Sequence, residues 1–132
     1  AILKGKKPAG PTPFGYRYDR WTGVWSVDAG EAETVREIYQ RVAAGESTQA
    51  IADDFTVRGV PRHQVVGRAP QWERARVYAI ARSTTYRGVW HADKAKRLTV
   101  PVPPIVTDEQ WHAAQAAFAA RNGNRLRGLA RS

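Results

Sequence analysis

The chain has 132 residues, 42% of them hydrophobic and 25% charged, which is the balance of an ordinary globular domain. It has no cysteine, which excludes disulfides, thiolate nucleophiles, iron–sulfur clusters and cysteine-based zinc sites from this sequence. Its 21 basic and 12 acidic residues give a net charge of +9, which favours nucleic acid as a partner over a membrane, although a solvated basic surface is the alternative. No apolar run approaches a membrane span of about 20 residues. The chain starts at Ala1 and contains no methionine, so we expect an excised or processed piece of a longer protein.

The first segments of the chain predict a flexible arm and a hairpin. Residues 1–13 are rich in lysine, glycine and proline and have too few apolar residues to nucleate a core. They predict an extended basic arm. Residues 14–18 alternate aromatic with small or polar residues, and 24–27 do so more weakly. A turn-like insert separates the two segments, which predicts a short β-hairpin.

A helix is predicted next, and its start and end are both marked in the sequence. Asp28 followed by Glu31 is typical of a capping box, with aspartate as the cap. Gly45 is the residue expected just after the end of the helix. Apolar residues recur at the spacing of one helical face, and they are Val35, Ile38, Tyr39 and Val42.

Two shorter helices follow and resemble a helix-turn-helix. Ser47 or Thr48 should cap the first, which ends before Gly59. The second is expected to begin at Trp72 and to run to Ser83, with arginines near its start. The polar and basic segment between the two helices is longer than the roughly 3–4 residues of a strict helix-turn-helix.

The last third of the chain predicts a second hairpin and a terminal helix. Residues 86–90 and 98–102 are β-prone and flank a charged turn. Thr107 and Gln110 form a capping box for an alanine-rich helix, and 121–132 is either a linker or a continuation of that helix. The fold class is therefore predicted to be α+β, a small and mostly helical domain with a helix-turn-helix-like pair and short β-hairpins.

The residues that could perform catalysis are few. His63, His91 and His112 do not form a metal-binding pair, and no glycine-rich phosphate loop is present. Asp53 and Asp54 are neighbours on a helix and diverge by about 100°, so they do not share a site. We expect no catalytic residue, no metal site and no cofactor in this chain.

A nucleic-acid-binding function has better support from the residues. A recognition helix is apolar on its inner side and carries long donor side chains in its first turns, as the helix over 72–83 does. The lysines of the arm suit contacts to phosphates or to the minor groove. A basic helical module that docks on an acidic protein is the alternative function.

Several short motifs occur in an ordered set over residues 13–118. They include Pro13-Phe14-Gly15-Tyr16, Arg58-Gly59-Val60-Pro61, Tyr86-Arg87-Gly88 and Thr107-Asp108-Glu109-Gln110-Trp111. No single motif is specific, but the set at these spacings resembles the recombinase domain of large serine recombinases, the serine-class phage integrases and transposon resolvases. Where that family has Asn-Pro before the Tyr-x-Gly motif, this chain has Thr84-Thr85.

The resemblance implies a role for each part of the chain. Residues 1–13 would be an interdomain arm, 14–120 the DNA-binding domain, and 121–132 a linker toward a zinc ribbon outside this sequence. The domain would bind double-stranded DNA at an attachment half-site and would not bind a membrane. The parent protein would be cytoplasmic and would act as a dimer to tetramer. The serine that attacks DNA would lie in another domain, so this chain itself would not be an enzyme. The DNA-contacting residues implied are Lys4, Lys6, Lys7, Arg62, His63, Arg68, Gln71, Arg74 and Arg76.

Overall fold

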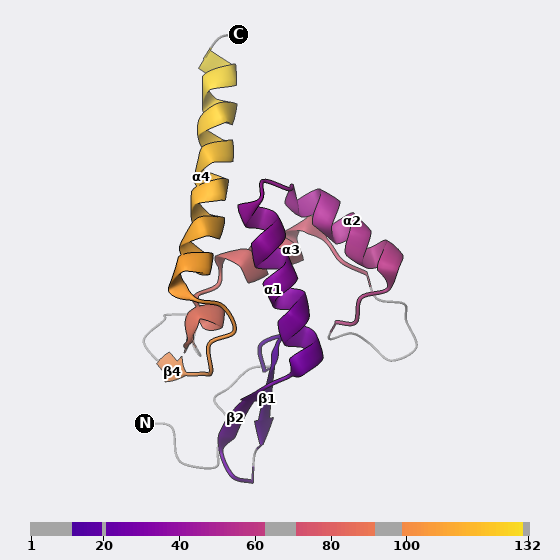
Figure 1. Cartoon of the computed structure of the whole chain (residues 1–132), viewed down its shortest axis with the longest axis vertical. Coiled ribbons are helices and arrows are strands. Elements are labelled where there is room, and N and C mark those ends of the chain that lie inside the picture. The colour runs from indigo at the N-terminus through magenta and orange to yellow at the C-terminus, as the bar shows by residue number, and fades with distance from the viewer. Residues whose placement is uncertain (1–11, 20, 63–70, 92–98, 131–132) are drawn as a thin grey trace.

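The computed structural model describes residues 12–19, 21–62, 71–91 and 99–130. Within those ranges the chain forms helices and two small antiparallel sheets, so the predicted mostly helical α+β class is confirmed (Figure 1). No helix in the described ranges is long and apolar enough to cross a membrane. The elements are β1 (Tyr16–Asp19), β2 (Val24–Val27), α1 (Ala29–Ala43), α2 (Thr48–Arg58), α3 (Arg74–Arg82), the 3₁₀ helix η1 (Thr84–Arg87), β3 (Val89–His91), β4 (Thr99–Pro101) and α4 (Asp108–Ala130).

The N-terminal hairpin is formed as predicted. β1 and β2 pair antiparallel, with Tyr16 opposite Val27. The Asp19 carboxylate accepts a hydrogen bond of 2.8 Å from the backbone N–H of Trp21, and Gly23 follows in the left-handed region at φ 71°. An aspartate that bonds the backbone two residues ahead, followed by a glycine, is a standard way to reverse a chain.

Helix α1 begins at the predicted cap, but the second half of the capping box has another partner. The Asp28 carboxylate accepts from the backbone N–H of Glu31 at 3.0 Å. The Glu31 carboxylate does not return to the cap residue; it accepts from the backbone N–H of Gly15 at 2.7 Å. Gly15 has φ +99°, and a Cβ there would lie 3.0 Å from Cδ1 of Ile105, so this approach requires glycine. The pair joins the hairpin to α1.

Helix α2 begins as expected, whereas α3 begins later than predicted. The Ser47 hydroxyl accepts from the N–H of Ala50 at 3.0 Å, so Ser47 and not Thr48 is the cap of α2. Trp72 was predicted to start α3, but the helix starts at Arg74 and Trp72 lies before it. The cause is tertiary, because the indole N–H of Trp72 donates to the carbonyl oxygen of Val60 at 2.9 Å and the ring is buried in the core.

The segment after α3 also differs from the prediction. A strand over 86–90 was expected, but Tyr86 lies in the 3₁₀ helix and only Val89–His91 is strand. The Ser83 hydroxyl accepts from the N–H of Thr85 at 3.1 Å and so opens the 3₁₀ turn. Gly88, at φ 116°, then directs the chain into β3, which pairs with β4.

The last helix has the predicted capping box in full. The Thr107 hydroxyl accepts from the N–H of Gln110 at 3.0 Å, and the Gln110 side chain accepts from the N–H of Thr107 at 2.9 Å. The backbone stays helical through Ala130, which favours the continuing helix over the linker for residues 121–130. α4 packs along α1 and extends beyond the rest of the described chain (Figure 1).

The core lies where α1, α3 and α4 meet the hairpin and the 3₁₀ turn. The predicted apolar face of α1 is buried, as are Ile51 and Phe55 of α2. Aromatic rings join the layers: Phe14 and Phe55 each meet Trp72 edge to face, at centroid distances of 5.6 and 5.1 Å. Such pairs add about 0.5–1.5 kcal/mol each beyond the area they bury. The inner side of α3 therefore packs against several other elements, and this packing fixes which residues of the helix face outward.

Candidate nucleic-acid interface

Helix α3 has one buried side and one outward side. Arg74, Tyr78 and Arg82 are exposed and follow one another at intervals of four residues, so they form a row along the helix. Ala75 and Ala79 are exposed beside that row. The buried side packs against α1, α2 and α4, and its residues are Val77, Ile80 and Ala81, as the sequence predicted.

The outward row is braced by α4. The ring of Tyr78 lies 4.9 Å from that of Phe118, and the Arg82 guanidinium carbon lies 5.9 Å from the centroid of the Tyr78 ring. Arg82 also donates to the Gln115 side chain at 3.0 Å. These contacts limit the conformations of Tyr78 and Arg82 before any ligand arrives, which lowers the entropy cost of a contact made by them.

Arg74 stands at the open end of the row. It lines a pocket of about 290 Å³ together with Tyr78, Arg121 and the first residues of α2. The structure gives Arg74 no ion pair with a described carboxylate. Its guanidinium is free to bind an external acceptor.

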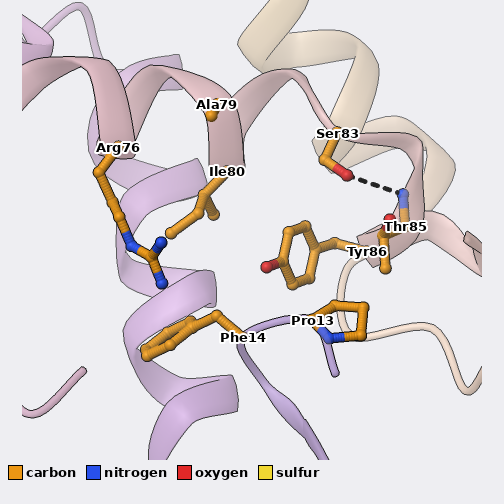
Figure 2. Close-up of a pocket in the computed structure, with 8 residues that line it drawn as sticks. All are labelled: Pro13, Phe14, Arg76, Ala79, Ile80, Ser83, Thr85 and Tyr86. Atoms are coloured by element: carbon orange, nitrogen blue, oxygen red, sulfur yellow. Dashed lines mark hydrogen bonds between the residues drawn. The ribbon is translucent and has the colours of Figure 1, made fainter. Parts of the chain in front are cut away.

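Arg76 has a different environment, although it is only two residues from Arg74. Its side chain is half-buried, its guanidinium carbon lies 5.8 Å from the centroid of the Phe14 ring, and its buried Nε has no hydrogen-bond partner. Burial lowers the pKa of Arg76 from its ordinary value, and the positive charge of Arg62 lowers it further. The guanidinium lines a pocket between α3 and the Phe14 turn (Figure 2).

Arg62 lies over the Trp72 ring, next to the Phe14 ring that Arg76 covers. Its guanidinium carbon is 5.9 Å from the Trp72 ring centroid, and its Nη1 donates to the carbonyl oxygen of Gln71. The Nε of Arg62 is also buried without a partner. Arg62 and Arg76 therefore lie over adjoining aromatic rings, because Phe14 and Trp72 are in contact.

Arg41 of α1 and Arg58 of α2 are used within the protein. Arg41 and Arg58 both donate to the carboxylates of Glu37 and Asp54, at 2.6–3.1 Å. These contacts lower the pKa of Glu37, with the hydrogen bond from Arg58 as the largest cause. The cluster links α1 to α2 and leaves little positive charge there for a ligand.

The structure brings together four of the predicted contact residues around the start of α3: Arg62, Gln71, Arg74 and Arg76. Gln71 is exposed. The others, Lys4, Lys6, Lys7, His63 and Arg68, lie outside the described residues. Within the described ranges no group of three histidine, cysteine, aspartate or glutamate side chains is placed to hold a metal ion.

Three residues of this region were not among the predicted contacts. Tyr78 and Arg82 could have been found from the helical spacing that relates them to Arg74. Tyr86, which lines the pocket beside Arg76, had no such signal, because its position depends on the 3₁₀ turn.

The chain matches a protein-family model described as Recombinase over residues 29–121. Two solved structures share its fold, one described as "Crystal Structure of a LSR-DNA Complex" and one as "Sequence Requirements of the Listeria innocua prophage attP site". Each has a TM-score of 0.61 and 18% identity over 86% of this chain. This chain spans 33% of the first and 44% of the second. No curated protein gives a match.

Proposed function

The chain belongs to the Recombinase family, and from that premise we propose that it is the DNA-binding recombinase domain of a large serine recombinase. In this proposal α3 enters the major groove of an attachment half-site. The domain contributes recognition of DNA, and strand cleavage by a serine is performed elsewhere in a parent recombinase that acts as a dimer to tetramer in the cytoplasm. The solved structures of similar fold, one of them described as an LSR–DNA complex, support this assignment.

The observation that carries the proposal is the outward side of α3. An α-helix with its side chains is about 10–12 Å across, which fits a major groove about 12 Å wide. The nine residues of α3 give it a length of about 14 Å at 1.5 Å per residue. Ala75 and Ala79 add almost no bulk, so the helix backbone can approach the base pairs closely. Arg74 and Arg82 stand at the two ends of the row and supply forked donors, the side chains that most often bind the O6 and N7 acceptors of guanine.

The remaining predicted residues would position the domain on the duplex. Gln71 is exposed three residues before the start of α3, where an amide can bind either a base edge or a phosphate. Lys4, Lys6 and Lys7 would follow the DNA backbone or the minor groove through the basic arm. His63 and Arg68, close in sequence to Arg62, would add phosphate contacts.

The experiment that tests this function is selection from a random duplex library at about 150 mM salt. We expect the full chain to enrich a motif of several base pairs. The Arg74→Ala variant should alter that motif, whereas Arg36→Ala, which removes an exposed arginine from α1, should leave it unchanged. Retention of duplexes without enrichment would contradict recognition by α3. Absence of retention would favour the basic module that docks on an acidic protein.

A further inference from the structure

A pocket of about 220 Å³ lies between α3 and the turn that begins at Pro13. Apolar side chains form most of its wall, among them Phe14 and Ile80. Figure 2 shows the Arg76 guanidinium reaching down from α3 toward the Phe14 ring, and the Tyr86 ring directing its hydroxyl into the same space from the opposite side. A charged donor and a neutral donor therefore converge on one small apolar pocket.

Neither donor has an acceptor in the described chain. Nε of Arg76 is buried without a hydrogen-bond partner. Tyr86 is only 3% exposed, and its hydroxyl, which donates to no described residue, is the part of the side chain that reaches the open space of the pocket. The two neighbouring buried tyrosines differ, because Tyr16 donates to Pro103 at 2.7 Å and Tyr39 to Ile80 at 2.8 Å, both at carbonyl oxygens. Buried polar groups are normally paired, so the unpaired buried Nε of Arg76 indicates a missing acceptor.

The chemistry of the pocket selects an anion. No carboxylate is among the residues that line it. Burial raises the pKa of Tyr86, so the phenol stays protonated and remains a donor. The charge of Arg62 beside Arg76 adds repulsion that an anion would relieve. Burial disfavours the charge of Arg76, and the carboxylates of Glu31 and Glu73 offset that cost only in part, so a bound anion would offset more of it.

The position of the pocket selects the kind of anion. Ala79 lines the pocket and also belongs to the outward side of α3, so the pocket borders the surface proposed to face DNA. Phosphates lie along the two margins of a helix in the major groove, whereas the base edges face the side of the helix that points to the floor of the groove. A recessed guanidinium at the margin of the helix is therefore placed for the sugar–phosphate backbone.

We propose that the pocket holds one backbone phosphate of the bound duplex between the Arg76 guanidinium and the Tyr86 hydroxyl, with Arg62 beside it as a second positive charge. This inference rests on the proposed DNA-binding function. It separates Arg76 from Arg74: Arg74 contributes to base preference, and Arg76 fixes the position of the domain on the DNA irrespective of sequence.

Two variants of the full chain test the pocket on the duplex that selection enriches. Arg76→Gln removes a charged contact and should weaken binding roughly 10- to 100-fold, equally on enriched and random duplexes. It should also lower the slope of log K against log salt by about 0.9. Tyr86→Phe removes only the hydroxyl and should weaken binding about 2- to 10-fold with the slope unchanged. Arg36→Gln is the matched charge control, because Arg36 is exposed on α1 and its guanidinium donates to the Ile105 carbonyl at 3.3 Å, away from the pocket; it should change neither quantity appreciably.

Neutral methylphosphonate substitutions, made one phosphate at a time, identify the contact. At one phosphate the substitution should weaken binding by the unchanged protein but have little effect on Arg76→Gln or on Tyr86→Phe. If the duplex still binds but no phosphate couples to either variant, the pocket proposal is wrong and the proposed function stands. If no duplex binds, both are wrong. Displacement of the duplex by an oligoglutamate peptide that depends on Arg76, without coupling to any phosphate, would assign the pocket to an acidic protein instead.

Discussion

The hydroxyl of Tyr39 on α1 donates a 2.8 Å hydrogen bond to the carbonyl oxygen of Ile80 near the end of α3. The same hydroxyl lies 3.2 Å from the carbonyl oxygen of Ser83. The last carbonyls of a helix have no partner within the helix, so a buried donor at this place satisfies them. One phenol of α1 thus secures the end of the helix that carries the proposed recognition surface.

Tyr39→Phe should lower the free energy of unfolding by about 0.5–1.5 kcal/mol, because it removes the hydrogen bonds of the phenol and keeps the ring. The Ile80 carbonyl still accepts from the Ser83 N–H, and the Ser83 carbonyl still accepts from the Trp111 indole N–H. Denaturant unfolding measures the change. Tyr18→Phe is the control, since no described residue bonds the Tyr18 hydroxyl, and it should shift stability by less than about 0.5 kcal/mol. Equal stability of the two variants would show that the Tyr39 bonds do not support the fold.

Alkaline pH should unfold the domain through its buried tyrosines. Burial raises the pKa of Tyr16, Tyr39 and Tyr86 above the ordinary value of 10.0. A raised pKa in the folded state gives stability that is complete below the unfolded value and is lost as pH rises above it. Above about pH 10, each of these tyrosines should lower the free energy of unfolding by about 1.4 kcal/mol per pH unit.

Tyrosinate absorbance recorded during a pH titration checks this expectation. The three buried tyrosines should ionise together with loss of structure. Ionisation of Tyr16, Tyr39 and Tyr86 near the ordinary pKa of 10.0 in a folded domain would contradict it.

The α1–α2 ion cluster should support stability above acidic pH. Hydrogen bonds from Arg58 and Arg41 lower the pKa of Glu37 below its ordinary value of 4.5. A lowered pKa gives stability that is present above the unfolded value and is lost as pH falls through the folded one. Because these groups are partly exposed, Glu37→Gln should cost only about 0.5–1 kcal/mol at neutral pH. Unfolding curves at a series of pH values should show the difference between the two proteins vanish well below about pH 4; a difference that persists there would have another cause.

Arg74→Ala and Lys6→Ala should weaken DNA binding in different ways. Loss of Arg74 should cost about 1–3 kcal/mol and relax the preference at particular base pairs. Loss of Lys6 should weaken all duplexes alike and reduce the salt slope by about one unit. Binding titrations on enriched and random duplexes at several salt concentrations separate the two. Identical effects on random DNA would remove α3 from the recognition role.

The helix starts were predictable because their signals are local. Asp28, Ser47 and Thr107 each bond a backbone N–H three residues ahead, so their chemistry is contained in a short stretch of sequence. The same stretches predicted the buried faces, since helical periodicity needs only a few turns. The second partner of Glu31 was not predictable, because Gly15 belongs to the preceding hairpin.

The parts that could not be predicted depend on residues distant in sequence. Trp72 is kept out of α3 by bonds to α2 and Val60, and helical propensity contains no sign of them. The sequence alone also does not distinguish the environment of Arg74 from that of Arg76, because both are arginines in one turn of the same helix. Their environments differ because Phe14 lies under one of them and not the other. Which basic side chain is free and which is recessed is therefore a property of the packed core.

The Trp72 indole bond to the Val60 carbonyl has a practical consequence for protein engineering. It ties the end of α2 to the start of α3 at the base of the intervening segment, so the length of that segment does not set how the two helices pack. Doubling the length of a closed loop costs only about 0.6 kcal/mol. A peptide inserted between Val60 and Trp72 would therefore leave the packing of α2 and α3 intact. The same insertion in the short turn between α1 and α2 would separate the arginine and carboxylate partners that hold those two helices together.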